Sequence, residues 1–130
     1  MLGNRVWQIL KTHADKAKFF APDTAFTEAQ THLPKILQKR GLNPDMALAI
    51  VDKLPALIAS VDADIYGPLE ATARRRLRKR DEDDWPILAT ALALDCPIWT
   101  EDADFFGTGV ATWTTDRVEL LLSEAESPRN

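Results

Sequence analysis

The sequence predicts an α/β domain with a mostly parallel sheet, and three observations support this prediction. Short apolar segments typical of strands alternate with segments of helical periodicity along the chain. The length of 130 residues suits one compact core. Hydrophobic residues make up 45% and charged residues 28%, which argues against collagen, long disorder and a disulfide scaffold. We therefore expect a single domain over residues 1–122 and a polar tail over residues 123–130.

The individual elements follow from spacing and from capping residues. Phe19 and Phe20 lie in a short apolar run that ends at Pro22, and Asp23 or Thr24 can cap the helix that follows. Asp83 or Asp84 opens a later helix with a proline in its first turn. The expected helices span residues 4–17, 23–39, 43–54, 67–79, 83–94 and 116–122, and the expected strands span residues 18–22, 58–65, 97–100 and 110–114.

Bulk charge and hydropathy narrow the functional class. Sixteen basic and 20 acidic residues give a net charge of −4, which disfavours a protein that coats nucleic acid through bulk charge. The longest apolar runs are far shorter than the roughly 20 residues of a membrane helix. The first residues lack the apolar stretch of a secretory signal. The single cysteine, Cys96, fits a reducing compartment, so we expect a cytoplasmic protein.

Acidic side chains follow predicted strands or begin predicted helices in three separate segments. Glu28 lies one turn inside the helix after the first strand, Asp84 opens the apolar helix, and Asp102 and Asp104 follow the strand 97–100. Ligands of parallel sheets bind beyond the carboxyl ends of the strands. Clustered carboxylates repel one another unless a cation intervenes, and Mg²⁺ and Mn²⁺ prefer oxygen ligands. The pattern indicates a divalent metal site.

Ordinary structural roles explain the same acids almost as well when each is taken alone. Asp83 or Asp84 could serve only as a helix N-cap, Glu28 could be a solvated helix residue, and Asp102 and Asp104 could be loop acids. The order and spacing of these residues therefore carry more information than their number.

That order resembles the PIN domain, a family that includes the VapC-type toxins of bacterial toxin–antitoxin pairs. The resemblance rests on Thr24-x-x-x-Glu28, on Asp84-x-x-x-Leu88 leading into an Ala-rich helix, and on Ile98-Trp99-Thr100-Glu101-Asp102-Ala103-Asp104-Phe105. It covers residues from about 4 to about 122 and is most specific between 84 and 106. It implies a three-layer α/β/α fold and a Mg²⁺- or Mn²⁺-dependent endoribonuclease.

The resemblance also implies a role for each matching residue. Glu28, Asp84 and Asp102 match catalytic metal-binding acids, and Asp104 matches a supporting metal-binding acid. Thr100 matches a hydroxyl residue at the end of its strand and is a candidate substrate contact. The family further implies a homodimer and, for the toxin branch, an antitoxin partner. The rival interpretations are a catalytically impaired PIN-like module that binds RNA or a partner, and a metal-dependent DNA nuclease.

One part of the family pattern is absent from this sequence. PIN domains begin with a short apolar central strand that carries an aspartate, and Met1–Val6 instead resembles the start of the helix after that strand. Either the sequence starts late or the protein is a naturally shortened relative. We favour the first explanation because the other site acids are present. In both cases we expect a gap in the sheet and weakened metal binding.

A basic strip, residues 74–80, precedes the acids. Six of its seven residues are Arg or Lys. An exposed, solvated helix end is the simplest interpretation. The functional alternative is contact with the RNA backbone through Arg74, Arg75 and Arg78, which would make binding depend on salt. Trp85, next to Asp84, is the tryptophan best placed to stack on a base.

Overall fold

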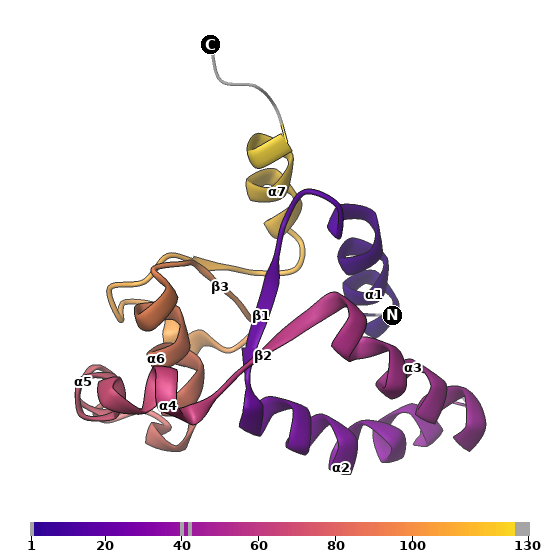
Figure 1. The fold of residues 1–130 in the computed structure, drawn as a ribbon, viewed down its shortest axis with the longest axis horizontal. Helices are drawn as coiled ribbons and strands as arrows, with labels where there is room; N and C mark the ends of the chain where they lie inside the picture. The colour runs from indigo at the N-terminus through magenta and orange to yellow at the C-terminus, as the bar shows by residue number, and fades with distance from the viewer. Residues whose placement is uncertain (1, 40, 42, 127–130) are drawn as a thin grey trace.

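The computed structural model describes residues 2–39, 41 and 43–126. Within them the chain forms two parallel two-stranded sheets surrounded by helices (Figure 1). This arrangement confirms the predicted mixed α/β class.

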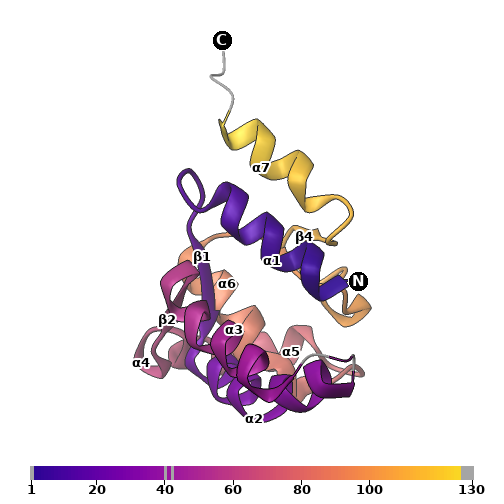
Figure 2. The ribbon, with the colours of Figure 1, turned by 90° about the vertical axis from the view of Figure 1, so that its right-hand side faces the viewer.

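The N-terminal elements build the first sheet. Its strands pair in parallel, with Phe19 opposite Ile58 and Pro22 opposite Val61. Two helices that lie side by side connect the strands (Figures 1 and 2). The elements are α1 (Leu2–His13), β1 (Phe19–Pro22), α2 (Asp23–Lys39), α3 (Pro44–Leu57) and β2 (Ile58–Val61).

The C-terminal elements build the second sheet, in which Ile98 pairs with Thr112 and Trp99 with Trp113. The helices and strands are α4 (Ala63–Tyr66), α5 (Glu70–Arg76), α6 (Trp85–Leu94), β3 (Ile98–Trp99), β4 (Thr112–Trp113) and α7 (Val118–Glu126). The 3-10 turns are η1 (Gly67–Leu69), η2 (Glu82–Asp84) and η3 (Ala103–Phe105).

Several boundaries differ from the sequence prediction; for example, α1 ends at His13 and α3 continues to Leu57. β2 ends at Val61, because Asp62 begins α4 and leaves Ile65 exposed. The segment 67–79 is divided between η1 and α5, and the helix ends at Arg76. α7 continues through Glu126, so the predicted start of the tail at residue 123 falls inside this helix; residues 127–130 lie outside the described part of the chain.

The larger core is centred on α6, which contains no charged residue. A helix that is apolar on all sides must be buried, and Leu88, Ala89 and Ala91 are at most 4% exposed. α6 contacts both β1 and β3. Its position therefore fixes Asp84, the residue just before it, relative to both sheets.

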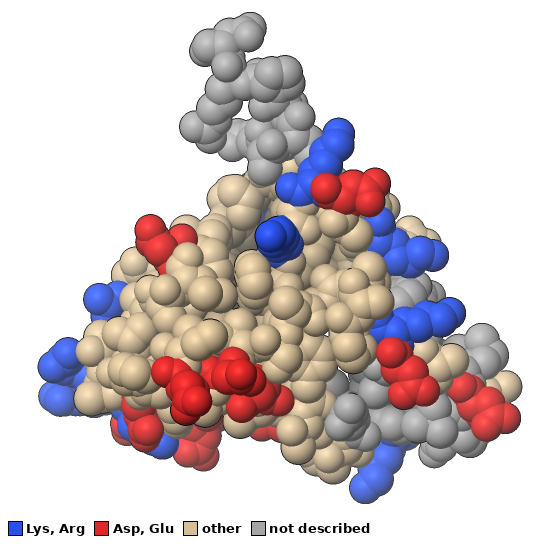
Figure 3. Space-filling model, in the orientation of Figure 1, with Lys and Arg blue, Asp and Glu red and all other residues tan. Residues whose placement is uncertain are grey.

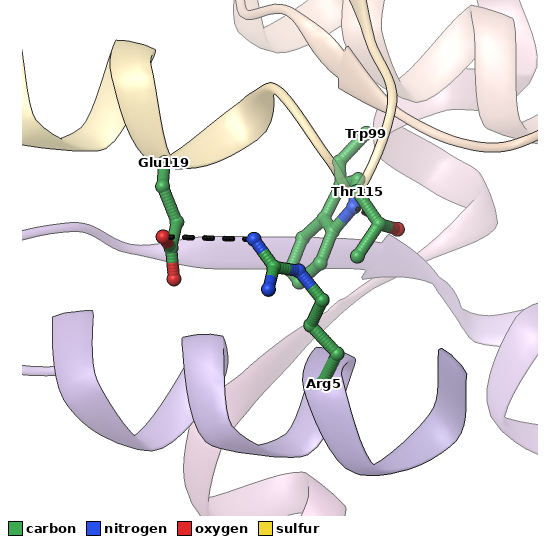
Figure 4. A network of polar contacts seen from close by, with 4 residues as sticks. All are labelled: Arg5, Trp99, Thr115 and Glu119. Atoms are coloured by element: carbon green, nitrogen blue, oxygen red, sulfur yellow. Dashed lines mark hydrogen bonds and ion pairs between the residues drawn. The ribbon is translucent and has the colours of Figure 1, made fainter. Parts of the chain in front are cut away.

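A second, smaller core joins α1 to α7. Ile9 and Val118 are buried between the two helices, next to Phe19 and Trp99. These helices lie side by side in Figure 2. Arg5 Nη2 also lies 3.8 Å from Glu119 Oε2, and Trp99 Nε1 donates a hydrogen bond to Thr115 Oγ1 at 3.0 Å (Figure 4).

An apolar groove separates the two sheets. Its volume is about 660 Å³. β1 and β3 both line the groove, as do Thr90 of α6 and Leu121 of α7. The described residues of β1 and β3 form no backbone hydrogen-bond ladder with each other. The ring of Phe19 nevertheless lies 5.9 Å from that of Trp99. The groove is thus bounded by two neighbouring strand edges.

None of the described helices is long and apolar enough to cross a membrane.

Candidate active site

Acidic residues follow directly on both strands of the first sheet. Asp23 comes after β1 and Asp62 after β2, and because the strands are parallel both acids lie at the same edge. Figure 3 shows acidic side chains gathered where β1 and β2 end in the view of Figure 1, with basic side chains at the margin beside α5.

Asp84 is the electrostatic centre of the predicted acids. Its pKa is raised, first by burial and then by the negative charges of Asp81, Asp102, Glu28 and Asp104. Glu28 and Asp102, the other two predicted catalytic acids, therefore lie within electrostatic reach of Asp84, as does Asp104, the predicted supporting acid.

The carboxylate of Asp84 is not used to cap α6. The residue occupies the N-cap position but accepts no cap hydrogen bond. Pro86, in the first turn, has no N–H to donate, which removes one of the usual donors to a cap. A helix N-terminus favours a carboxylate, yet burial and the neighbouring acids outweigh this effect on the pKa. The capping interpretation therefore does not account for Asp84.

Asp102 is held in a tight turn. Its N–H donates to Thr100 Oγ1 at 3.0 Å, and its Oδ1 accepts the N–H of Asp104 at 2.9 Å. Thr100 thus shapes the turn that presents Asp102. Glu28, in contrast, is exposed on α2.

The acids are close without forming a preassembled metal cage. Among the described residues, no three His, Cys, Asp or Glu side chains approach closely enough to hold a metal ion. The donor type still suits a hard cation, because Mg²⁺ keeps several waters and is often held by one or two carboxylates plus substrate phosphates. The arrangement can attract such a cation but does not enclose it.

The predicted RNA-binding arginines have different surroundings. Arg74 donates from Nε to Glu70 Oε2 at 2.8 Å and lies 5.5 Å above the ring of Trp85. Arg75 and Arg78 are exposed. Trp85 is half-buried against Tyr66, at 5.5 Å between ring centroids. The structure thus leaves Arg75 and Arg78 as the more accessible cations of the predicted set.

Sequence reasoning missed two features near this site. Tyr66 donates a 2.5 Å hydrogen bond to Asp23 Oδ1, which ties α4 to the end of β1. Arg76 and Arg80 donate to backbone carbonyls within and just after η3. A signal for the second feature was present, because the nearby Gly107 and Gly109 mark a loop of unusual backbone conformation.

The geometry defines an α/β protein with carboxylates gathered at the carboxyl ends of its parallel strands. A family model described as PIN domain matches residues 1–123. The chain therefore belongs to the PIN domain family, whose members are generally nucleases and typically depend on divalent metals. No curated protein and no solved structure matches the sequence.

Proposed function

We propose that this protein is a metal-dependent ribonuclease that hydrolyses phosphodiester bonds in RNA. The observation that supports this most strongly is the electrostatic coupling of Asp84 to Glu28, Asp102 and Asp104. Three separated segments supply these acids, and folding brings them together although like charges repel. Such an arrangement is costly unless it serves a cation.

Each residue has a distinct role in this proposal. Glu28, Asp84 and Asp102 would hold Mg²⁺ or Mn²⁺ and would orient the attacking water, while Asp104 would add negative potential. A bound divalent ion would supply charge neutralisation at the phosphate and a water of lowered pKa. Arg75 and Arg78 would hold the RNA backbone nearby. Thr100 supports Asp102, and any contact between Thr100 and RNA is secondary to that role.

We further propose that full activity needs an extended apolar segment in the groove between β1 and β3. The two strand edges and the apolar lining suit a strand. The family pattern places a metal-binding aspartate on such a strand. Fusing a short apolar segment with Asp-x-Asn ahead of Met1 should strengthen Mn²⁺ binding, measured by calorimetry. Equal affinities with and without the added segment would reject this part of the proposal.

The test of the main function is a cleavage assay on the chain as it stands. The proposal predicts cleavage of RNA with Mn²⁺ or Mg²⁺, no cleavage with EDTA, and little cleavage of single-stranded DNA of the same sequence. Preferential cleavage of DNA would indicate the DNA nuclease instead. The reading frame immediately upstream of the Met1 codon is an independent check on the segment in the groove.

A second candidate function is a module that binds RNA or a protein partner without cleaving. The specific observation in its favour is that the described acids form no close group of three. RNA binding that persists without divalent ions, and without cleavage in any condition, would support this alternative.

If the nuclease belongs to the toxin branch of the family, we propose a cytoplasmic homodimer that is inhibited by an antitoxin. Light scattering tests the dimer.

A further inference from the structure

Two arginines of the basic strip bind backbone within the protein. Arg80 Nη1 donates to the carbonyl oxygen of Asp104 at 2.7 Å and to that of Phe106 at 2.6 Å. Arg76 Nη1 donates to the carbonyl oxygen of Thr108 at 2.9 Å. We call the segment that they hold, residues 102–109, the acidic loop. It begins with Asp102 and includes Asp104.

The acidic loop is also fastened from inside. Asp102 accepts the N–H of Asp104, and Thr108 Oγ1 donates to the carbonyl oxygen of Phe105 at 2.7 Å. Phe105 is 1% exposed and belongs to the larger core. Phe105 therefore fixes the loop in the core, and the two guanidinium groups bind the carbonyl oxygens of Asp104, Phe106 and Thr108.

The glycines of the loop are adapted to these arginines. Gly107 and Gly109 have φ values of +83° and +90°, which side chains other than glycine rarely adopt. A Cβ on Gly109 would lie 2.8 Å from Arg76 Nη1, and one on Gly107 would lie 3.4 Å from Arg80 Nη2. The backbone conformation therefore favours glycine at both positions, and a side chain at position 109 would also have to displace the guanidinium group of Arg76.

Both arginines come shortly before Asp81 and Asp84 in the chain. Lys79 has a φ of +69°, which reverses the backbone after α5, and the N–H of Arg80 bonds the carbonyl oxygen of Leu77 at 2.8 Å. Asp81 and Asp84 follow at once. The segment that leads to Asp84 is thus bound directly to the loop that carries Asp102.

We infer that Arg80 and Arg76 are positioning residues that hold the acidic loop against the segment leading to Asp84. This inference rests on the proposed nuclease function. It assigns these two arginines to the geometry of the site, whereas Arg75 and Arg78 remain the proposed RNA contacts. A charge-assisted hydrogen bond to a carbonyl is stronger than a neutral one, so each contact limits the movement of the loop.

Amide hydrogen exchange, measured by NMR, tests the inference without any requirement for activity. Arg80→Ala and Gly109→Ala should each speed exchange in residues 104–108 by about tenfold or more, because the loop opens locally. The amide of Leu88 should keep its protection, which shows that the core is intact. Arg117→Ala removes an exposed arginine on another segment and serves as the control. Wild-type exchange rates in the loop of Arg80→Ala would overturn the inference.

The cleavage assay adds a readout that loss of stability alone would not move. Well below its unfolding temperature, Arg80→Ala should lower kcat by about 10- to 100-fold through misplacement of Asp102, with little change in KM. Arg80→Lys should recover part of this loss. A higher KM with a weaker salt dependence of RNA binding would instead identify a phosphate contact and overturn the inference. If the wild-type chain cleaves no RNA, the proposed function fails, and hydrogen exchange still decides the role of the arginines.

Discussion

Asp102 lies within electrostatic reach of Asp84, although separate segments of the chain supply the two residues. Burial, then Asp81 and then Asp102 raise the pKa of the Asp84 carboxyl. α6 brings this relationship about, because it packs on both β1 and β3 and follows directly on Asp84. The proposed chemistry depends on this convergence.

Asp102→Asn should abolish cleavage while leaving the fold intact. The asparagine Oδ1 can still accept the N–H of Asp104, so the turn is preserved. We expect the rate of RNA cleavage to fall by at least about 100-fold, the scale on which loss of one charge-stabilising group acts. Binding of RNA should change little. Asp95→Asn, at the far end of α6, is the matched control; equal losses in both variants would contradict a specific role for Asp102.

Asp84→Asn should stabilise the protein at neutral pH in the absence of divalent ions. A carboxyl whose pKa is raised on folding stabilises the fold fully below its unfolded value of 3.8, and this contribution is lost as pH rises through the raised pKa. Asparagine at position 84 carries no charge, so the variant does not lose this stability as pH rises. Thermal unfolding should show a higher Tm for the variant at neutral pH and a smaller difference near about pH 3.5. A difference that does not depend on pH would exclude this electrostatic explanation.

Tyr66→Phe should remove one hydrogen bond while keeping the ring packed on Trp85. Because Asp23 is only half-buried, we expect a loss of about 1–2 kcal/mol in the free energy of unfolding, measured by chemical denaturation. Burial and then Asp23 raise the pKa of Tyr66 above 10.0. The wild-type protein should therefore lose stability as pH rises through that raised pKa, and the phenylalanine variant should lack this alkaline transition.

The packing of α1 against α7 should contribute more to the free energy of unfolding through Ile9 than through Arg5. The side chains of Arg5 and Glu119 are 53% and 47% exposed, so solvent screens their ion pair, and Arg5→Ala should cost less than about 1 kcal/mol. Ile9 is 1% exposed, and Ile9→Ala should cost about 2–5 kcal/mol. Comparable losses in the two variants would contradict this ranking.

Local chemistry made much of the fold predictable from the sequence. Pro22 followed by Asp23 marks the change from strand to helix, and the structure has that change at the predicted residue. The apolar run after Asp84 gave α6 with its proline in the first turn. β2 was predicted too long because Ile65 looks like a strand residue, whereas Asp62 begins a helix there.

The site was predictable in part, since each predicted acid lies in or next to a recognisable element. The contacts of Arg76 and Arg80 were not, because they join residues 24 to 32 positions apart in the chain. Periodicity describes only neighbours along the chain, so a basic strip looks the same whether it faces solvent or backbone carbonyls. Only the packing of α5 against α6 and the path of the acidic loop decide between the two.

Calorimetric titration of Mn²⁺ into the wild-type protein and into Glu28→Gln, Asp84→Asn and Asp102→Asn tests the central claim most directly. If the three acids share one cation, each substitution should weaken binding by about tenfold or more, and Asp95→Asn should not. Wild-type affinity in all three variants would show that these side chains hold no common ion.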